Sequence, residues 1–401
     1  MKKVFFIFCA LLILACPTNQ LFAEEASDFS TPQEEAMESD EFEQEVFRAK
    51  VLEIIEEDRR EQDDEGYFNQ EFQDLRIKAL DGRFKNREIT FTNSKKRIDS
   101  PYFYAEQGDL IVVYWSNSEA LQFSLENIYR LNKIYILAAL FFLLIIIFTK
   151  FKGVRALASL GITLAILIYI VAPQIANGTN PLFISAISAF LILGISIFLG
   201  HGIKTSSIVA FISAAITLIL AILLSWLTVK YLGLTGLGTE DAYWLFVGNL
   251  DFLNLQSLLL AGIIISIVGI LDDVTIVQAS LVEEIHKMNK QLTLKELYKK
   301  GITVGKEHII SMVNTLIIIY AGVALPILVY LGHDNFWGKP FWARLNEDSI
   351  VEEIARALAG STALVLAVPI TTLLAAYVFS KQQSIRDKTP SNENKNEKDE
   401  K

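Results

Sequence analysis

Long apolar runs separated by short polar segments dominate the chain from residue 134 onward. Each run is long enough, or nearly so, to cross about 30 Å of hydrocarbon as a helix. They predict seven membrane spans: Ile134–Phe148, Val154–Val171, Leu182–Leu199, Ile208–Val229, Leu255–Leu271, Ile309–Leu331 and Ala357–Phe379. The pattern therefore predicts an α-helical polytopic membrane protein, with a transmembrane bundle over residues 131–380 and a disordered tail over residues 381–401.

A different pattern precedes the spans. Apolar and polar positions alternate in part, and β-branched residues are frequent, in four segments: Val46–Ile55, Phe72–Leu80, Arg87–Thr92 and Asp109–Trp115. Turn-forming residues such as Asp81 and Gly82 separate these segments. Four or five short strands are typical of a small antiparallel barrel of the OB or SH3 kind. We therefore expect a β-barrel-like domain over residues 46–130, and no catalytic constellation is visible within it.

The N-terminus has the features of a secretory signal. Two lysines precede the apolar run Val4–Ala15, and a cut after Ala23 would define a signal over residues 1–23. An uncleaved anchor and a lipoprotein signal ending at Cys16 are alternatives. Residues 24–45 are acidic and poor in aromatics, which predicts a disordered linker. Both cysteines lie in the first apolar run, so cleavage would leave no disulfide, thiolate metal site or cysteine nucleophile.

Basic residues gather in alternate loops between the spans. The rich loops contain Lys150, Lys152 and Arg155; Lys204; six lysines between Lys287 and Lys306; and Lys381, Arg386 and Lys388. Short loops rich in lysine and arginine are cytoplasmic, so the C-terminus is predicted inside and the β domain outside. The predicted signal requires the same orientation. The chain is 52% hydrophobic, and no basic stripe with aromatic residues predicts nucleic-acid binding.

Two adjacent carboxylates, Asp272 and Asp273, follow the apolar run Leu258–Leu271 directly. A charge at the bilayer centre costs about 2.5–3.5 kcal/mol on insertion scales, so such residues usually face a bundle interior or a water path. If the helix continues, Asp272, Thr275 and Gln278 follow one another at spacing i, i+3, i+6. The helix could also break near Gly269, or the acids could begin a cytoplasmic loop and cap a new helix at Val274.

The last two predicted spans also contain polar residues. Asn314 and Thr315 in the sixth could complete a polar path facing the Asp pair, or could hydrogen-bond a neighbouring helix for packing. We interpret His308, near the start of that span, as a solvated residue at the cytoplasmic boundary. Arg356 at the start of the seventh can pair with Glu353 or Glu352 at helical spacing. For Glu353 and Arg356 a boundary salt bridge is the preferred interpretation.

Several motifs of enzymes and nucleotide-binding proteins are absent from the sequence. Residues 301–306 resemble a phosphate loop, but the spacing is one residue short and Glu307 replaces the required Ser or Thr. The four histidines show no metal-ligand spacing, and no HExxH or GxSxG occurs. The sequence therefore predicts no catalytic residues, no cofactor and no metal site, and a transporter would need a gradient for energy.

The chain resembles the YibE/F-like family of bacterial multi-pass membrane proteins. The matching segments are those from Leu258 to Leu281, from Glu307 to Pro326 and from Glu352 to Ala376, together with AKVLEI near Lys50 and LDGRFKNREI before Phe91. The resemblance implies an integral protein of the bacterial plasma membrane with an external N-terminal domain. Members are often described as permeases, without an established substrate or residue-level mechanism.

Two functional hypotheses follow. The first is a gradient-coupled transporter of a small solute or ion, whose polar core comprises Asp272, Asp273, Thr275, Gln278, Asn314 and Thr315. The second is a scaffold or receptor whose β domain binds an envelope protein while the spans anchor it in the lipid bilayer. An intramembrane enzyme ranks below both, because no nucleophile–base pair is visible. The sequence leaves the solute, the transport direction and any oligomer open.

Overall fold

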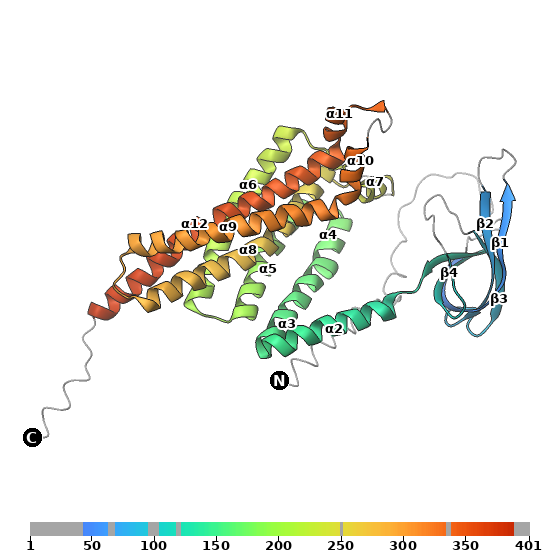
Figure 1. Cartoon of the computed structure of the whole chain (residues 1–401), viewed down its shortest axis with the longest axis horizontal. Helices are drawn as coiled ribbons and strands as arrows, with labels where there is room; N and C mark the ends of the chain where they lie inside the picture. Colours follow the sequence, from blue (N-terminus) through green and yellow to red (C-terminus); the bar gives the residue numbers. More distant parts are fainter. Residues whose placement is uncertain are drawn as a thin grey trace, which may run out of the picture. The chain divides into compact units, whose positions relative to one another are not determined.

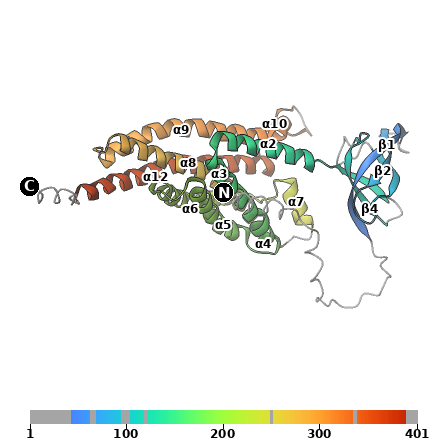
Figure 2. The same ribbon diagram turned by 90° about the horizontal axis from the view of Figure 1, so that it is seen from below.

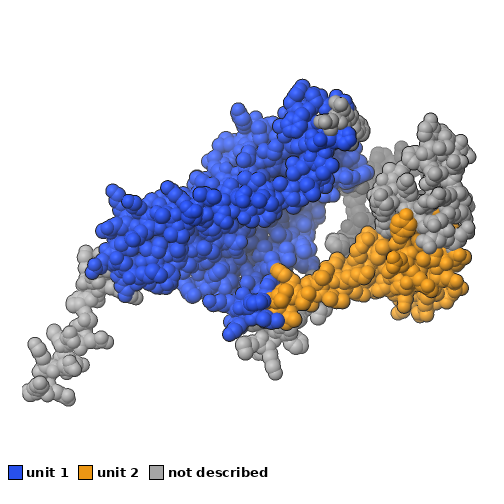
Figure 3. Space-filling view, viewed as in Figure 1, with its two compact units in different colours: residues 1–18, 145–401 blue, residues 19–144 orange. Residues whose placement is uncertain are grey.

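The computed structural model describes residues 43–62, 69–94, 104–117, 122–248, 252–333 and 338–388 (Figure 1). The predicted signal and nearly all of the predicted acidic linker lie outside these residues. The described chain divides into two compact units, one up to residue 144 and one from residue 145 onward (Figure 3). The division falls inside helix α2 (Leu131–Thr149) rather than at the predicted domain boundary after residue 130.

The unit up to residue 144, orange in Figure 3, contains one antiparallel sheet that curls into a half-barrel. Its strands are β1 (Gln44–Gln62), β2 (Asn69–Ala79), β3 (Glu88–Ser94), β4 (Leu110–Ser116) and β5 (Phe123–Ile128). The spatial order is β3-β2-β1-β4-β5, and the edge strands β3 and β5 approach each other. Its existence and its antiparallel, barrel-like form are as predicted, and the fifth strand follows the last segment that the sequence pattern identified.

Alternation along the strands explains the core of this sheet. Phe47, Ala49 and Val51 on β1 are buried, whereas Lys50 between them is exposed. Phe84, in the turn after β2, packs its ring against those of Phe47 and Trp115. The unit therefore has a hydrophobic core of its own.

The rest of the described chain is helical. The elements after α2 are α3 (Phe151–Ile166), the π-helical segment η1 (Leu167–Val171), α4 (Ala172–Ala176), α5 (Pro181–His201), α6 (Thr205–Leu232), α7 (Glu240–Val247), α8 (Leu255–Met288), α9 (Leu294–Val323), α10 (Leu325–Gly332), α11 (Phe341–Leu345) and α12 (Asp348–Lys388). Among the described residues, seven helices are long and apolar enough to span a membrane. The predicted seven-span helical bundle is confirmed.

Helix α8 lies at the centre of the helical unit, which is blue in Figure 3. It packs against α5, α6, α9 and α12, while α12 also packs on α6 and α9. Figures 1 and 2 both show α9 running along α8 and α12. Side-chain caps mark the starts of two of these helices. At the start of α8, Asn254 accepts a hydrogen bond from the Ser257 N–H, and at the start of α9, Thr293 forms a capping box with Glu296.

Several predicted span boundaries are wrong by a turn or more, including both ends of the last two spans. The sixth span was expected at Ile309–Leu331, but α9 already begins at Leu294 and ends at Val323, and α10 follows after Ala324. Pro326 explains the interruption because it cannot continue an existing helix without losing a backbone hydrogen bond. The seventh begins at Asp348, not Ala357, and continues to Lys388, past the predicted start of the tail at residue 381.

Candidate functional site

Helix α8 carries the Asp pair near its middle. It runs without a break from Leu255 to Met288, which is about 50 Å at 1.5 Å per residue. Buried positions continue along it as far as Val282. The pair therefore does not begin a loop, Val274 does not start a new helix, and Gly269 does not break the old one. Of the alternatives left open by the sequence, the continuous helix is the one observed.

The two aspartates line a cavity of about 440 Å³ between α3, α5 and α8. Asp272 is half-buried and accepts a hydrogen bond from the Ser196 hydroxyl of α5. Its other oxygen, Oδ1, has no hydrogen-bond partner among the described residues. Hydroxyl groups of Ser159 and Thr163 on α3 line the same cavity. Asp273 is exposed, so one half-buried and one exposed carboxylate share this space with three hydroxyls.

Two histidines lie within electrostatic range of this pair. His201, the last residue of α5, lines the cavity and interacts with both aspartates. His308 on α9 is half-buried and interacts with Asp273. His308 therefore has Asp273 in its surroundings as well as solvent, which the sequence did not indicate.

The π-helical segment η1 adjoins the cavity. Leu167, its first residue, is one of the lining side chains. A π-helical turn widens the backbone locally and is frequent at functional sites. The helix formed by α3, η1 and α4 is thus irregular where it passes the Asp pair.

Gln278 belongs to a different contact, on another side of α8. Its amide Nε2 donates to the Gly301 carbonyl of α9 at 3.1 Å and to the Thr372 hydroxyl of α12 at 2.7 Å. Gly301 and Gly305 allow α9 to approach this closely, because a Cβ on Gly305 would lie 2.6 Å from Val368 and 2.9 Å from the Gln278 amide. Gln278 therefore joins three helices and does not line the cavity.

The predicted polar core is wrong as a single site. Three residues of α-helix turn through about 300°, so each i, i+3 step moves the side chain by about 60° around the axis. By Gln278 the side chain consequently points to other helices than Asp272 does. Asn314 and Thr315 are exposed on α9, and the Thr315 hydroxyl donates to the Ser311 carbonyl of its own helix at 2.9 Å. Thr275 is fully buried but does not line the cavity.

Comparison with known proteins places this bundle in a family. The family described as YibE/F-like protein matches residues 137–381, which is more than half of the chain. The chain belongs to the YibE/F-like family. No curated protein and no solved structure matches it.

The family match contains the Asp pair, its cavity and the Gln278 contact. It begins within α2 and ends in α12, so the β strands precede it. The resemblance noted in the sequence extended into the β domain, beyond the matched residues. Family membership supports a multi-pass membrane protein and assigns no substrate.

The start of α12 holds a carboxylate that the sequence offered only as a possible partner of Arg356. Glu352 is 2% exposed and accepts hydrogen bonds from the Gly236 and Gly238 N–H groups, at 2.9 and 3.2 Å. Its neighbour Glu353 lies 3.3 Å from Arg356 Nε in an ion-pair contact. Glu352 thus fixes the glycine-rich loop after α6, and Arg356 pairs with the i−3 partner.

The short connection before α12 is held by a second set of polar contacts. Arg344 is buried and donates to the Tyr330 and His333 carbonyls at 2.8 and 2.5 Å. Lys339 lies 2.8 Å from Glu347, and its hydrogen bond lowers the pKa of that carboxyl. These contacts connect α10 and α11 to the start of α12.

Sequence reasoning missed the residues that surround the Asp pair. Ser159, Thr163, Ser196 and His201 come from helices far from Asp272 in the chain. A serine or threonine in an apolar span is common, because it can hydrogen-bond its own helix, so none of these residues stands out alone. His201 had one available signal: it is a histidine at the end of a predicted span.

Proposed function

We propose that this protein is a secondary transporter of a small solute or ion in the bacterial plasma membrane, with Asp272 and Asp273 as the coupling group. The observation that carries the proposal is the cavity that both aspartates line inside the helical unit. Carboxylates within membrane spans are rare, and they mark ion pathways and proton relays.

The surroundings of the pair suit a proton or a cation. An ionised carboxylate away from bulk water is costly unless it is paired, and the Oδ1 atom of Asp272 has no protein partner among the described residues. The nearby hydroxyls of Ser159, Thr163 and Ser196 supply oxygen ligands of the kind that hard cations prefer. A bound proton or cation would balance the charge of the pair, and its release would restore that charge.

One helix bears on the proposed source of energy for transport. Residues 301–306, which resemble a phosphate loop in sequence, lie within the helix α9 and form no loop that could hold ATP. The proposed driving force is therefore an ion gradient. In the proposed orientation the basic loops, including the α5–α6 turn, face the cytoplasm, as does the C-terminus, and the β unit is extracytoplasmic.

The test uses purified protein reconstituted in liposomes that contain a pH-sensitive dye. Gradients of protons, Na⁺ or K⁺ are imposed, and a panel of inorganic ions and small organic solutes is supplied in turn. Wild-type protein should move protons or cations in response to at least one solute, and the double variant Asp272→Asn with Asp273→Asn should not. The matched control is Glu284→Gln, which neutralises an exposed carboxylate on the same helix that pairs with Lys287 at 2.8 Å. Coupled flux that survives the double substitution would contradict the coupling role.

A second candidate function is a scaffold or receptor, and the separate core of the β unit favours it. That unit packs its own aromatic cluster around Phe47 and Phe84, as a binding module does. Deleting residues 43–130 distinguishes the two functions. A transporter should retain coupled flux without the sheet, whereas a receptor should lose crosslinking to envelope proteins and show no flux in either form.

A further inference from the structure

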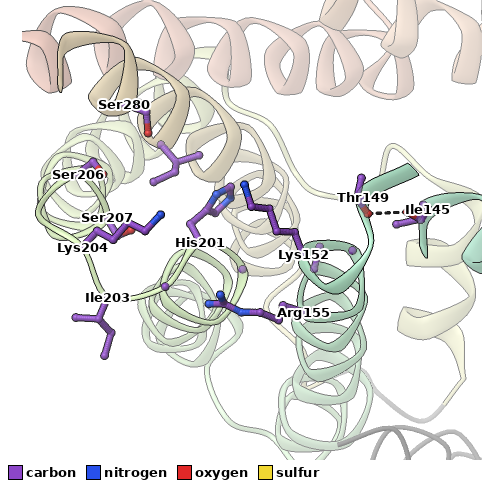
Figure 4. A pocket seen from close by; sticks show the side chains of 15 residues that line it. Ile145, Thr149, Lys152, Arg155, His201, Ile203, Lys204, Ser206, Ser207 and Ser280 are labelled. Atoms are coloured by element: carbon purple, nitrogen blue, oxygen red, sulfur yellow. Dashed lines mark hydrogen bonds between the residues drawn. The ribbon is translucent and has the colours of Figure 1, made fainter. Parts of the chain in front are cut away.

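A second cavity, of about 560 Å³, lies at the turn between α5 and α6. Its polar lining comes from five helices and the turn itself, and includes Lys152, Arg155, His201, Lys204, Ser207 and Ser280 (Figure 4). No aspartate or glutamate is among the lining residues. From this geometry we propose that the cavity binds a phosphate-type oxyanion, either as a free anion or as the headgroup of a phospholipid. The proposal does not depend on transport.

The first turn of α6 supplies backbone donors. This helix spans 28 residues from Thr205, and its N-cap Lys204 makes no side-chain capping hydrogen bond. The N–H groups of the first turn have no partner within a helix, and the helix dipole adds partial positive charge at the same place. These are the groups that bind phosphate at helix N-termini in other folds.

The hydroxyl of Ser207 is a second observation, separate from the helix N-terminus, that indicates a ligand in this cavity. Its side chain is 1% exposed, lies in the first turn of α6 and lines the cavity. Its hydroxyl oxygen is buried and has no hydrogen-bond partner among the residues that the structure describes. A buried hydroxyl without a partner is destabilising, so natural proteins usually provide one. An oxyanion in the cavity would accept the hydroxyl proton.

Cationic side chains reach the cavity from two sides. Lys152 and Arg155 project from α3 toward the turn that carries His201 and Lys204 (Figure 4). Arg155 is held in place because its guanidinium donates to the Leu199 carbonyl at 2.8 Å and to the Phe198 carbonyl at 3.4 Å. The turn itself depends on Gly202, whose φ of +85° is strained for any other residue.

Three acidic groups lie near the cavity, and none of them lines it. Glu283 on α8 lies 2.9 Å from Lys287 and also accepts from Ser206. Glu283 attracts Lys204 as well, so it lowers the net positive charge of the site without removing it. Asp272 and Asp273 line the adjoining cavity, which shares Ala156, Gly200 and His201 with this one. The side chains that line the cavity itself are cationic or neutral, with Lys152, Arg155 and Lys204 beside the imidazole of His201.

The test measures binding of inorganic phosphate to full-length protein in neutral detergent by titration calorimetry. Sodium chloride at equal ionic strength serves as the salt control, because surface charge effects are screened alike by both salts. A parallel arm uses nanodiscs of phosphatidylcholine with or without phosphatidic acid, and counts retained lipids by native mass spectrometry. Binding of phosphate identifies a free-anion site; retention of phosphatidic acid without phosphate binding identifies a headgroup site.

The variants are Ser207→Ala and the double substitution Lys152→Gln with Lys204→Gln. Loss of each charged hydrogen-bond donor should weaken binding about tenfold, and loss of the neutral hydroxyl about threefold. Lys230→Gln is the matched control, because this lysine is at the other end of α6, over the Trp226 ring. It should bind as the wild type does.

Two results would overturn the proposal. One is wild-type protein that binds neither phosphate nor phosphatidic acid above the chloride and phosphatidylcholine controls. The other is a double-lysine variant that binds as tightly as the wild type. Lys152 and Lys204 are both exposed, so this variant should keep its fold, which circular dichroism and gel filtration verify. If it does not fold, the comparison of Ser207→Ala with wild type decides in its place.

Discussion

Asp272 and Gln278 are less than two turns apart on α8, yet their surroundings differ in kind. The Gln278 amide donates to two neighbouring helices, and glycines on α9 leave room for those contacts. Asp272 has one donor, Ser196, and its Oδ1 has no hydrogen-bond partner among the described residues. The Gln278 Oε1 also lacks such a partner, but Gln278 does not line the cavity. The first residue is packed against helices and the second faces a cavity.

The comparison distinguishes polar residues that stabilise a membrane bundle from polar residues that can bind a ligand. A buried polar group with protein partners on two helices stabilises their contact. A partly buried carboxylate with an unpaired oxygen beside a cavity contributes little to folding stability, but it can bind a ligand there. Three experiments test this distinction, and a fourth tests the ion pair in the connection before α12.

The largest effect is expected where Gln278 meets α9. Gly305→Leu would place side-chain atoms where Val368 and the Gln278 amide already lie, so overpacking should cost about 3 kcal/mol or more of unfolding free energy. Gly322→Leu, on the same helix with nothing within 4 Å of its would-be Cβ, should cost far less. Unfolding in mixed detergent micelles measures both. Equal midpoints for the two variants would refute close packing at Gly305.

The next experiment compares Gln278 and Asp272 directly. Gln278→Leu should lower the unfolding free energy by about 1 kcal/mol, because it removes two hydrogen bonds between helices. Asp272→Asn should leave that free energy unchanged or higher, since the amide keeps an oxygen for Ser196 and removes a costly charge. The same unfolding assay applies. The distinction fails if Asp272→Asn proves the more destabilising substitution.

A functional counterpart concerns two serines of α5. Ser196→Ala would leave Asp272 without its hydrogen-bond donor, so coupled flux in liposomes should fall by roughly tenfold. Ser185→Ala removes a fully buried hydroxyl that has no partner among the described residues, and flux should not change. Similar losses in both variants would indicate that α5 tolerates no substitution, rather than that Ser196 positions Asp272.

The smallest effect is expected at the Lys339–Glu347 pair. Lys339 lowers the pKa of Glu347, so the pair stabilises its segment above the ordinary glutamate pKa and loses that contribution as pH falls through the lowered value. Solvent screens this pair, which keeps the effect small. The protection of residues 338–347 against hydrogen exchange, corrected for the intrinsic exchange rate at each pH, should fall slightly in acid, and less so in Glu347→Gln. A variant whose exchange depends on acid as strongly as the wild type would show that another group titrates.

The bundle was predictable because its signal is local. An apolar run of about 20 residues has few alternatives to a membrane helix, and basic loops add an expected orientation. Strand alternation likewise predicted the sheet, since Phe47, Ala49 and Val51 alternate with polar neighbours. Boundaries were harder where amphipathic turns extend a span, as at Leu294 in α9 and Asp348 in α12.

The sequence by itself determined the family, the helical and β classes, and the Asp pair as the unusual feature of α8. Only the tertiary structure decided what the pair faces. A polar side chain shows its role through the helices that surround it, and those come from distant parts of the chain. Thus Ser159, Ser196 and His201 line the same cavity as the aspartates. Gln278 donates to Gly301 and Thr372 instead, and Asn314 and Thr315 are exposed on α9. In the sequence the pair is two carboxylates that follow an apolar run, and in the structure it forms part of the wall of a cavity.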